Sequence, residues 1–172
     1  SPDAADPDTS DGFEIPTCGC SAGEVCIEQP TDPNNKSCYV IEEVALGGAH
    51  TCALFLGGTV ACWGDNTNRQ VSPKGDTITP ILRPRFVDFG TGQAKALCAG
   101  TAHTCAIIDI GSNAREVRCW GDDTHSQTGP AGDGNDPGDF DVFTVPGLGT
   151  DVREIACGAE HTCALLGDNG ID

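Results

Sequence analysis

The sequence predicts an all-β chain built from repeats. Its 23 glycines and 11 prolines, with only 5% aromatic residues, are typical of short strands joined by turns. A motif recurs at intervals of 53 and 58 residues within residues 41–172. A unit of this length, with about four strands, cannot bury both faces of its sheet alone. Consecutive units must therefore stack on one another, as they do in a β-propeller or another repeat array.

Charge and cysteine content restrict the class of protein. Nine Lys and Arg residues against 26 Asp and Glu residues give 172 residues a net charge of −17. This acidity disfavours nucleic acids and anionic membranes as partners, because both bind basic surfaces. Eleven cysteines without a single C-x-x-C pair indicate disulfides rather than zinc sites. We therefore expect an exported protein, extracellular or at the cell surface.

Two further features concern export. No run of about 18 apolar residues occurs, so the sequence predicts no transmembrane helix. The chain contains no Met, so we expect that a signal peptide has been removed or that the sequence begins after the start codon.

Residues 1–17 are rich in Asp and Pro and poor in apolar side chains. Such a segment cannot bury enough surface to offset its chain entropy, so we expect an acidic disordered stalk. A lipid at its start would make the stalk a membrane tether, as in a lipoprotein. The alternative is calcium binding by Asp6, Asp8 and Asp11, which offer oxygen ligands in a D-x-D-x-x-D-G pattern.

Residues 18–40 form a second segment that is too short to have a core of its own. We expect two disulfides to hold it as a small knob, and three pairings remain open. A metal site that uses the first two cysteines is the alternative. The cysteines of the knob are Cys18, Cys20, Cys26 and Cys38.

The repeats divide at residues 41–93, 94–150 and 151–172, the last of which is incomplete. Each begins with a short apolar run, a Gly three residues before a His, and a strand with T-C-A-[LI]. A turn follows, and in the first two copies a second strand ends in C-W-G-D. The recurring large side chains, which we expect to be structural, are His50, His103, His161, Trp63 and Trp120.

The first repeat shows the local signals most clearly. Strand-length runs at 44–46, 51–56 and 59–63 lie between glycines, and Gly57-Gly58 predicts a hairpin turn. The second repeat has a longer connection at 109–116, which we expect to be an insertion in the turn and not in the strands.

This repeat resembles that of the regulator of chromosome condensation family, whose unit combines G-x-x-H-[ST]-x-A-L with W-G-x-N-x-x-G-Q-L-G. The resemblance implies a β-propeller, seven-bladed in the family, and it is strongest to secreted bacterial variants with paired cysteines. Arg69, Val71 and Asp123 depart from the family pattern, where Gly, Leu and Asn are usual. The matching positions are Gly47, His50, Thr51, Ala53, Leu54, Trp63, Gly64, Asn66 and Gln70, then Gly100, His103, Thr104, Ala106, Trp120, Gly121, Gln127 and Gly129, then Gly158, His161, Thr162, Ala164 and Leu165.

The cysteine spacing predicts one disulfide inside each complete hairpin. Cys52 and Cys62 lie on the two strands of one hairpin, and Cys105 and Cys119 on those of the next. Facing residues of antiparallel strands have Cβ atoms close enough for a disulfide. Two buried free thiols in each hairpin are the alternative.

Three cysteines remain in the repeats. Cys163 is unpaired in this sequence, and its partner is expected at 173–177, so we expect the chain to continue; a second subunit that completes the ring is the alternative. Cys98 and Cys157 form a bridge between neighbouring repeats in one interpretation and act as small apolar side chains in the other. A one-residue offset between them argues against the bridge, because it points them to opposite faces unless a bulge intervenes.

No catalytic motif occurs, and we expect no enzyme and no cofactor. Each recurring His is expected to bond to backbone near the inner strands, with a ring of metal-binding histidines as the alternative. His125 is expected to be solvated. A loop offers oxygen donors for calcium, with a solvated loop as the alternative. These weak calcium candidates are Asp133, Asn135, Asp136, Asp139 and Asp141.

Two functions compete. The first is a protein-interaction module that binds protein partners through the inter-repeat loops 65–92 and 121–150, which differ in length and sequence. The second is a structural component of a surface assembly or fibre, formed by self-assembly. An enzyme that uses an axial pocket is a third alternative with no motif in its favour.

Overall fold

The protein is all-β in its computed structural model, as the sequence predicts. The residues described are 18–29, 32–73, 79–129 and 142–167. Over these ranges the structure contains no helix, and therefore none that is long and apolar enough to cross a membrane. The predicted stalk, with its calcium alternative, and the predicted calcium loop at 133–141 lie outside these ranges.

The chain divides into two compact units, residues 1–39 and 40–172. Eleven strands lie in the described ranges. In chain order they are β1 (Glu24–Gln29), β2 (Asp32–Leu46), β3 (His50–Phe55), β4 (Thr59–Gly64), β5 (Ile81–Phe86), β6 (Gln93–Ala99), β7 (His103–Gly111), β8 (Ala114–Gly121), β9 (Phe143–Thr144), β10 (Val152–Cys157) and β11 (Thr162–Leu166).

The first unit is held by two disulfides, Cys18–Cys26 and Cys20–Cys38. Of the three pairings that the sequence leaves open, the structure has the one that links the first cysteine to the third and the second to the fourth. A turn before β1 is closed twice, because the amide of Glu24 donates to the Ser21 carbonyl and its carboxylate accepts from the Ser21 amide.

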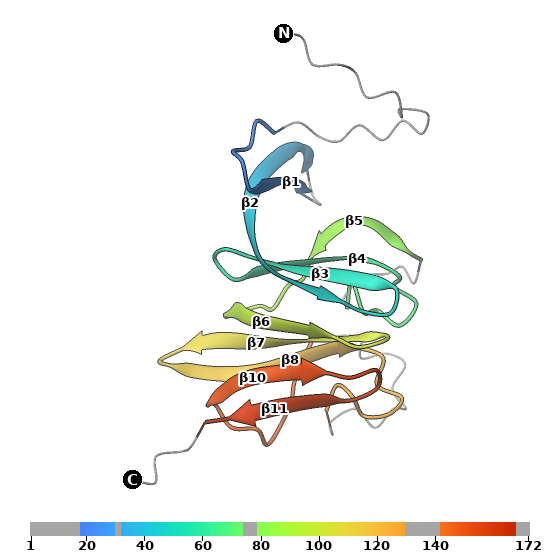
Figure 1. Ribbon diagram of the computed structural model, residues 1–172, viewed down its shortest axis with the longest axis vertical. Coiled ribbons are helices and arrows are strands. Elements are labelled where there is room, and N and C mark those ends of the chain that lie inside the picture. The colour runs from blue at the N-terminus through green and yellow to red at the C-terminus, as the bar shows by residue number, and fades with distance from the viewer. Residues whose placement is uncertain (1–17, 30–31, 74–78, 130–141, 168–172) are drawn as a thin grey trace. The chain divides into compact units, whose positions relative to one another are not determined.

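The second unit consists of antiparallel sheets, which we call blades (Figure 1). The first blade contains the end of β2, from Ile41 onward, with β3, β4 and β5. The second contains β6 to β9, and the third contains β10 and β11. Each blade has a bulge at the same place in its first strand, at Ile41/Glu43 in the first blade, and this agreement shows that the repeats share one backbone plan.

The hairpins differ in a way that the sequence did not predict. The β3–β4 hairpin turns at Gly57 and Gly58, both with positive φ, as expected. In the second blade, however, the additional residues lengthen β7 and β8 to nine and eight residues. The turn contains only Ser112 and Asn113, whose φ angles of 55° and 59° suit a tight two-residue hairpin. The expected insertion in the turn is therefore wrong, because the extra residues continue the strand pairing.

The apolar core lies between the blades. One cluster joins the first blade to the second through residues such as Leu54, Val60 and Ile108, and another joins the second blade to the third through Ile107 and Val152. Both faces of β7 are buried over its first six residues, so this strand is a central element of the stack.

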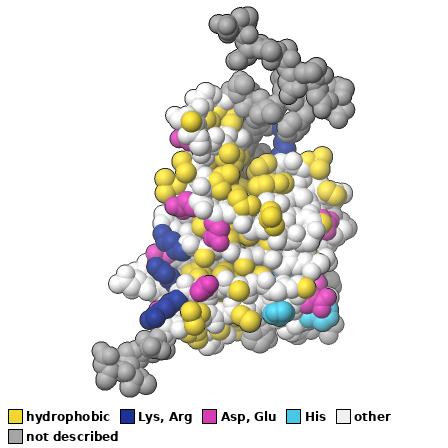
Figure 2. Space-filling view, viewed as in Figure 1, with side chains coloured by type: hydrophobic (Ala, Val, Ile, Leu, Met, Phe, Trp, Pro, Cys, Tyr) yellow, Lys and Arg dark blue, Asp and Glu magenta, His cyan; other side chains and the backbone are white. Residues whose placement is uncertain are grey.

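The first strand of the first blade exposes apolar side chains. Val44 and Leu46 of β2 alternate with Ala45, which belongs to the core shared with the second blade, so they point away from that blade and are 49% and 72% exposed. Figure 2 shows apolar side chains gathered over this part of the unit.

Candidate functional site at the junctions between blades

The recurring Gly-x-x-His segment forms the turn between the first two strands of each blade. In the second blade the amide of Gly100 donates to the carbonyl of His103, and the corresponding bonds occur at Gly47 and Gly158. The imidazole lies directly over the glycine, so that a Cβ on Gly100 would overlap Cε1 and Nδ1 of the His103 ring. This close contact, not a left-handed backbone, requires glycine at the position.

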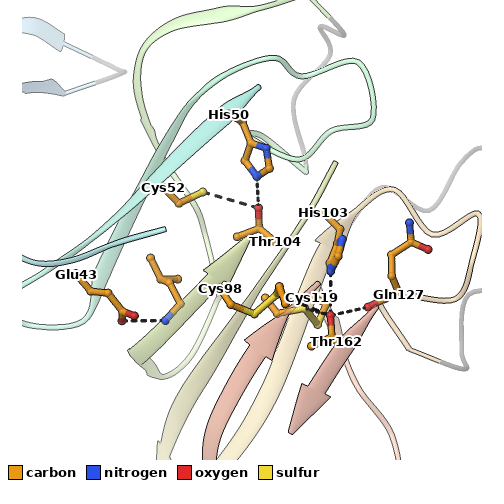
Figure 3. The surroundings of a disulfide bond; sticks show 12 residues. Glu43, His50, Cys52, Cys98, His103, Thr104, Cys119, Gln127 and Thr162 are labelled. Atoms are coloured by element: carbon orange, nitrogen blue, oxygen red, sulfur yellow. Dashed lines mark hydrogen bonds between the residues drawn. A yellow bond between two sulfur atoms is a disulfide. The ribbon is translucent and has the colours of Figure 1, made fainter. Parts of the chain in front are cut away.

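Each buried histidine bonds to a threonine of the following blade. At the first junction, between the first and second blades, Nε2 of His50 lies 2.8 Å from Oγ1 of Thr104 (Figure 3). The Thr104 hydroxyl donates to the backbone carbonyl of Gln70. Because that hydroxyl has only one hydrogen, the donor in the first bond is Nε2–H of His50, which fixes the tautomer of the ring.

The second junction, between the second and third blades, repeats this arrangement. Nε2 of His103 lies 2.9 Å from Oγ1 of Thr162, and the Thr162 hydroxyl donates to the carbonyl of Gln127. We expected backbone as the partner of each recurring histidine, and for His50 and His103 that expectation is wrong. Each of these two rings bonds instead to a threonine side chain of the neighbouring blade. The stacked sheets bring the histidine at the start of one hairpin against the threonine that follows the histidine of the next.

Burial keeps these histidines neutral. His50 is 3% exposed, and its Nδ1, like that of His103, is buried without a hydrogen-bond partner. The pKa of His50 is lowered from 6.5 to about 4, mainly by burial and also by His103, while Asp65 opposes the change. Burial also lowers the pKa of His103, and the nearby Asp122 opposes this. Each neutral ring uses its Nε2–H in the bond to threonine and so joins two blades without burying a charge.

The tryptophan of the second blade seals the first junction. Nε1 of Trp120 donates to the same Gln70 carbonyl that accepts from Thr104, and its ring lies 5.7 Å from that of Phe89 in an edge-on contact. Trp120 is fully buried, whereas Trp63, its counterpart in the first blade, is partly exposed. One carbonyl oxygen thus receives two donors from the following blade.

A cavity of about 260 Å³ lies at the second junction. Gln127 and Val145, which line it, are the counterparts of Gln70 and Val87 of the first junction. His125 also lines this cavity and is exposed, as predicted, with Nε2 3.8 Å from a carboxylate oxygen of Glu160.

A polar turn follows the second hairpin strand in each complete blade. In the first blade Asp65 accepts from the backbone and hydroxyl of Thr67, at 3.2 and 2.6 Å, and from Nε2 of Gln70 at 2.9 Å. The hydroxyl of Thr67 is the main cause of a lowered pKa at Asp65. Oδ1 of Asn66 accepts from the two amides after Gln70, at 3.0 and 2.9 Å.

The second blade has the same turn. Asp122 accepts from Thr124 and from Nε2 of Gln127, and Asp123, in the place of the usual Asn, accepts from the amide of Thr128. The departure from the family pattern at Asp123 therefore keeps the acceptor that the turn needs.

The hairpin disulfides join the pairs that the spacing predicts. Cys52 lies opposite Cys62 and Cys105 opposite Cys119, with Cα atoms 4.1 Å apart in both. All four are fully buried. Cys163 is free and exposed.

Cys98 and Cys157 form a disulfide between the second and third blades, at a Cα–Cα distance of 5.4 Å. In the strand register Cys98 lies opposite Cys105, and its side chain points to the third blade. Cys157 lies opposite Thr162, and its side chain points to the second blade. The argument from their one-residue offset is wrong for a physical reason. Blades stack face to back, so residues that meet must lie on opposite faces of their own sheets.

Potential metal-ligand clusters of three residues in the described ranges contain disulfide-bonded cysteines, with Glu24 in one of them, and no histidine. Sequence reasoning did not anticipate the roles of Thr104 and Thr162 or of the carbonyls of Gln70 and Gln127. Their recurrence at fixed positions after the histidine and the tryptophan was the available signal.

The stacked, disulfide-linked blades define a repeat protein of the β-propeller class. A family model for the regulator of chromosome condensation (RCC1) repeat matches residues 41–70. The probable E3 ubiquitin-protein ligase HERC4 of Homo sapiens is 30% identical over 152 residues, which are 86% of this chain and 14% of that protein. The ultraviolet-B receptor UVR8 of Arabidopsis thaliana is 30% identical over 125 residues, 73% of this chain and 27% of that protein.

Solved structures agree on the fold. Human WBSCR16 has a TM-score of 0.61 at 22% identity, covering 80% of this chain and 35% of that one. Yeast RCC1 (Prp20), in a complex with Kap60, has a TM-score of 0.60 at 24% identity, covering 76% and 28%. The chain belongs to the RCC1-type repeat family, and it spans less than a third of the length of HERC4 or UVR8.

Proposed function

We propose that the chain is a protein-binding module of an exported protein and has no catalytic activity of its own. The observation that carries this proposal is the pair of polar turns that begin at Asp65 and Asp122. Both are held by the same internal hydrogen bonds, and the sequences that follow them differ in length and composition. Variable loops on a rigid scaffold are the usual arrangement of a recognition surface.

The blades stack in one orientation, which places the two turns at the same end of neighbouring blades. The amide of Gly48 bonds to the carbonyls of Gly100 and Thr101, which lie in the corresponding turn of the next blade. One partner could therefore contact Asn68 and His125, which occupy the same position in the two turns and are both exposed.

The cysteines support an oxidising location. Ten of the eleven cysteines are paired, and such a density of disulfides persists outside the reducing cytosol. We therefore place the protein outside the cell or at its surface. Yeast Prp20, with the same fold, is described in a complex with Kap60 and by its binding to Gsp1p and histones, which are all proteins.

The net charge of −17 suggests the chemistry of the partner. Long-range attraction favours a protein with a basic surface. A fluorescent peptide of alternating Lys and Ser is a suitable probe, with a peptide of Glu and Ser as its control. Binding is measured by fluorescence anisotropy at low and at physiological salt.

Asn68→Lys and His125→Lys place a positive charge in each turn. Leu56→Lys is the matched control, because it adds the same charge to an exposed position in the hairpin turn at the other end of the first blade. We expect each turn variant to weaken binding of the basic peptide by roughly threefold or more, and the control by less than about half of that effect. Equal effects of all three variants, or no binding of the basic peptide at low salt, would contradict the proposal.

A further inference from the structure

Two disulfides lie side by side at the second junction. The Sγ atoms of Cys98, Cys105 and Cys157 all lie within 4.8 Å of one another, and Cys119 is bonded to Cys105. Figure 3 shows Cys98 and Cys119 beside Thr162 at this junction. The bridge between the blades and the staple within the second blade therefore lie close together, with sulfur atoms of both within 4.8 Å of one another.

The strand register gives Cys105 two potential partners. It lies directly opposite Cys119 on β8 and directly opposite Cys98 on β6. Facing residues of neighbouring antiparallel strands are close enough for a disulfide on either side. In the first blade Ala45 stands opposite Cys52, so that Cys52 has a cysteine on one side only.

The two disulfides differ in access. Cys105 and Cys119 have no exposed surface, whereas Cys98 and Cys157 are partly exposed. The bridge between the blades is therefore the more accessible of the two disulfides to a reductant from solvent. The staple is open to attack from inside, by the sulfur of Cys98.

We propose that Cys98, Cys105, Cys119 and Cys157 form a thiol–disulfide exchange site. An external dithiol supplies two electrons and two protons, is itself oxidised to a disulfide, and leaves Cys98 and Cys157 as thiols. The Cys98 thiolate then attacks Sγ of Cys105. A Cys98–Cys105 bond forms, the Cys105–Cys119 bond breaks, and the electron pair leaves with Cys119, which takes up the proton that Cys98 released.

This exchange has a structural consequence. The remaining disulfide connects β6 to β7 within the second blade, and the covalent link to the third blade is gone. Cys119 becomes a thiol beside the cavity that it lines. Reduction by one equivalent thus converts a bridge between blades into a bond inside one blade.

The test maps disulfides after partial reduction with about 0.1 mM dithiothreitol. It uses a Cys163→Ser chain, because the free thiol of Cys163 is exposed and could otherwise take part in exchange. Free thiols are blocked with N-ethylmaleimide and the chain is cut with trypsin. Residues 96–115 form one tryptic peptide that contains Cys98 and Cys105.

Among chains labelled at two cysteines of the second unit, the expected product carries the labels on Cys119 and Cys157, and peptide 96–115 is unlabelled with an internal disulfide. Labels on Cys98 and Cys157, with the Cys105–Cys119 staple intact throughout, would overturn the proposal. This measurement requires no substitution within the sulfur cluster, so a failure to fold cannot obscure it.

A rate comparison gives a second test with an internal control. The Cys105–Cys119 staple should open at least about tenfold faster than Cys52–Cys62, because a neighbouring thiol acts at a high effective concentration. Adding Cys98→Ser and Cys157→Ser should bring the two rates together. If the two staples open at equal rates in the parent chain, the exchange does not occur.

Discussion

Acidification should weaken the blade stack through the buried histidine of the first junction. The pKa of His50 is lowered from 6.5 to about 4, mainly by burial. Its Nδ1 has no hydrogen-bond partner, so a proton bound there would have no acceptor. The unfolded chain takes up a proton near pH 6.5, while the folded chain resists protonation until about pH 4. The stabilising contribution of neutral His50 is therefore complete above pH 6.5 and is lost as the pH falls from 6.5 to about 4.

The magnitude follows from the pKa difference between the folded and unfolded states. One pKa unit corresponds to about 1.4 kcal/mol, so the loss in the free energy of unfolding is about 2 kcal/mol by pH 5 and about 3 kcal/mol below pH 4. His103, whose pKa is also lowered by burial, adds a loss in the same direction. The pKa of Asp65 is lowered from 3.8, so its contribution disappears only at lower pH, outside the histidine window.

The assay is denaturant unfolding at closely spaced pH values between 7.5 and 4, followed by tryptophan fluorescence. His50→Gln should reduce the pH dependence and leave the part that comes from His103, whereas His125→Gln, at an exposed position, should leave it unchanged. NMR of the imidazole protons should show His50 titrating near pH 4. A titration near 6.5, or an equal effect of the two substitutions, would refute the reasoning.

Two further substitutions test the contacts at the first and second junctions. Gly100→Ala should lower the free energy of unfolding by about 2–3 kcal/mol, because the new Cβ overlaps the His103 ring. The control Gly111→Ala, in open space with φ +91°, should lower it by only about 1 kcal/mol. Equal losses would contradict the overlap. Trp120→Phe should lower the free energy of unfolding by about 2–3 kcal/mol, because the buried Gln70 carbonyl loses its indole donor and the smaller ring leaves a gap. The control Trp63→Phe, at a partly exposed position, should lower it clearly less. Comparable losses of the two variants in thermal unfolding would argue against the role of the buried ring at the junction.

Local features of this chain were predictable because they depend on spacing within one hairpin. The Gly57-Gly58 turn and the pairing of Cys52 with Cys62 follow from a ten-residue separation and a period of two. The bonding partners of the histidines were not predictable in this way. Thr104 lies 54 residues after His50, and the contact depends on the direction in which consecutive sheets stack.

The same limit explains the bridge between Cys98 and Cys157. Counting residues along each strand gives the face on which a cysteine lies, but not which faces meet. Once the face-to-back stacking is known, the one-residue offset becomes the condition for the bond instead of an obstacle to it. The pairing in the knob was open for a simpler reason, since four cysteines in a coreless segment allow three connectivities.

The histidine–threonine contact makes stability a property of adjacent pairs of blades. The second blade bonds to the third through His103 and to the first through Thr104, so the loss of one contact directly destabilises only the two blades that share it. Such a one-dimensional arrangement lets segments open independently. Amide hydrogen exchange should then be slowest in β7, which is covered on both faces, and faster in β11, whose side chains are largely exposed.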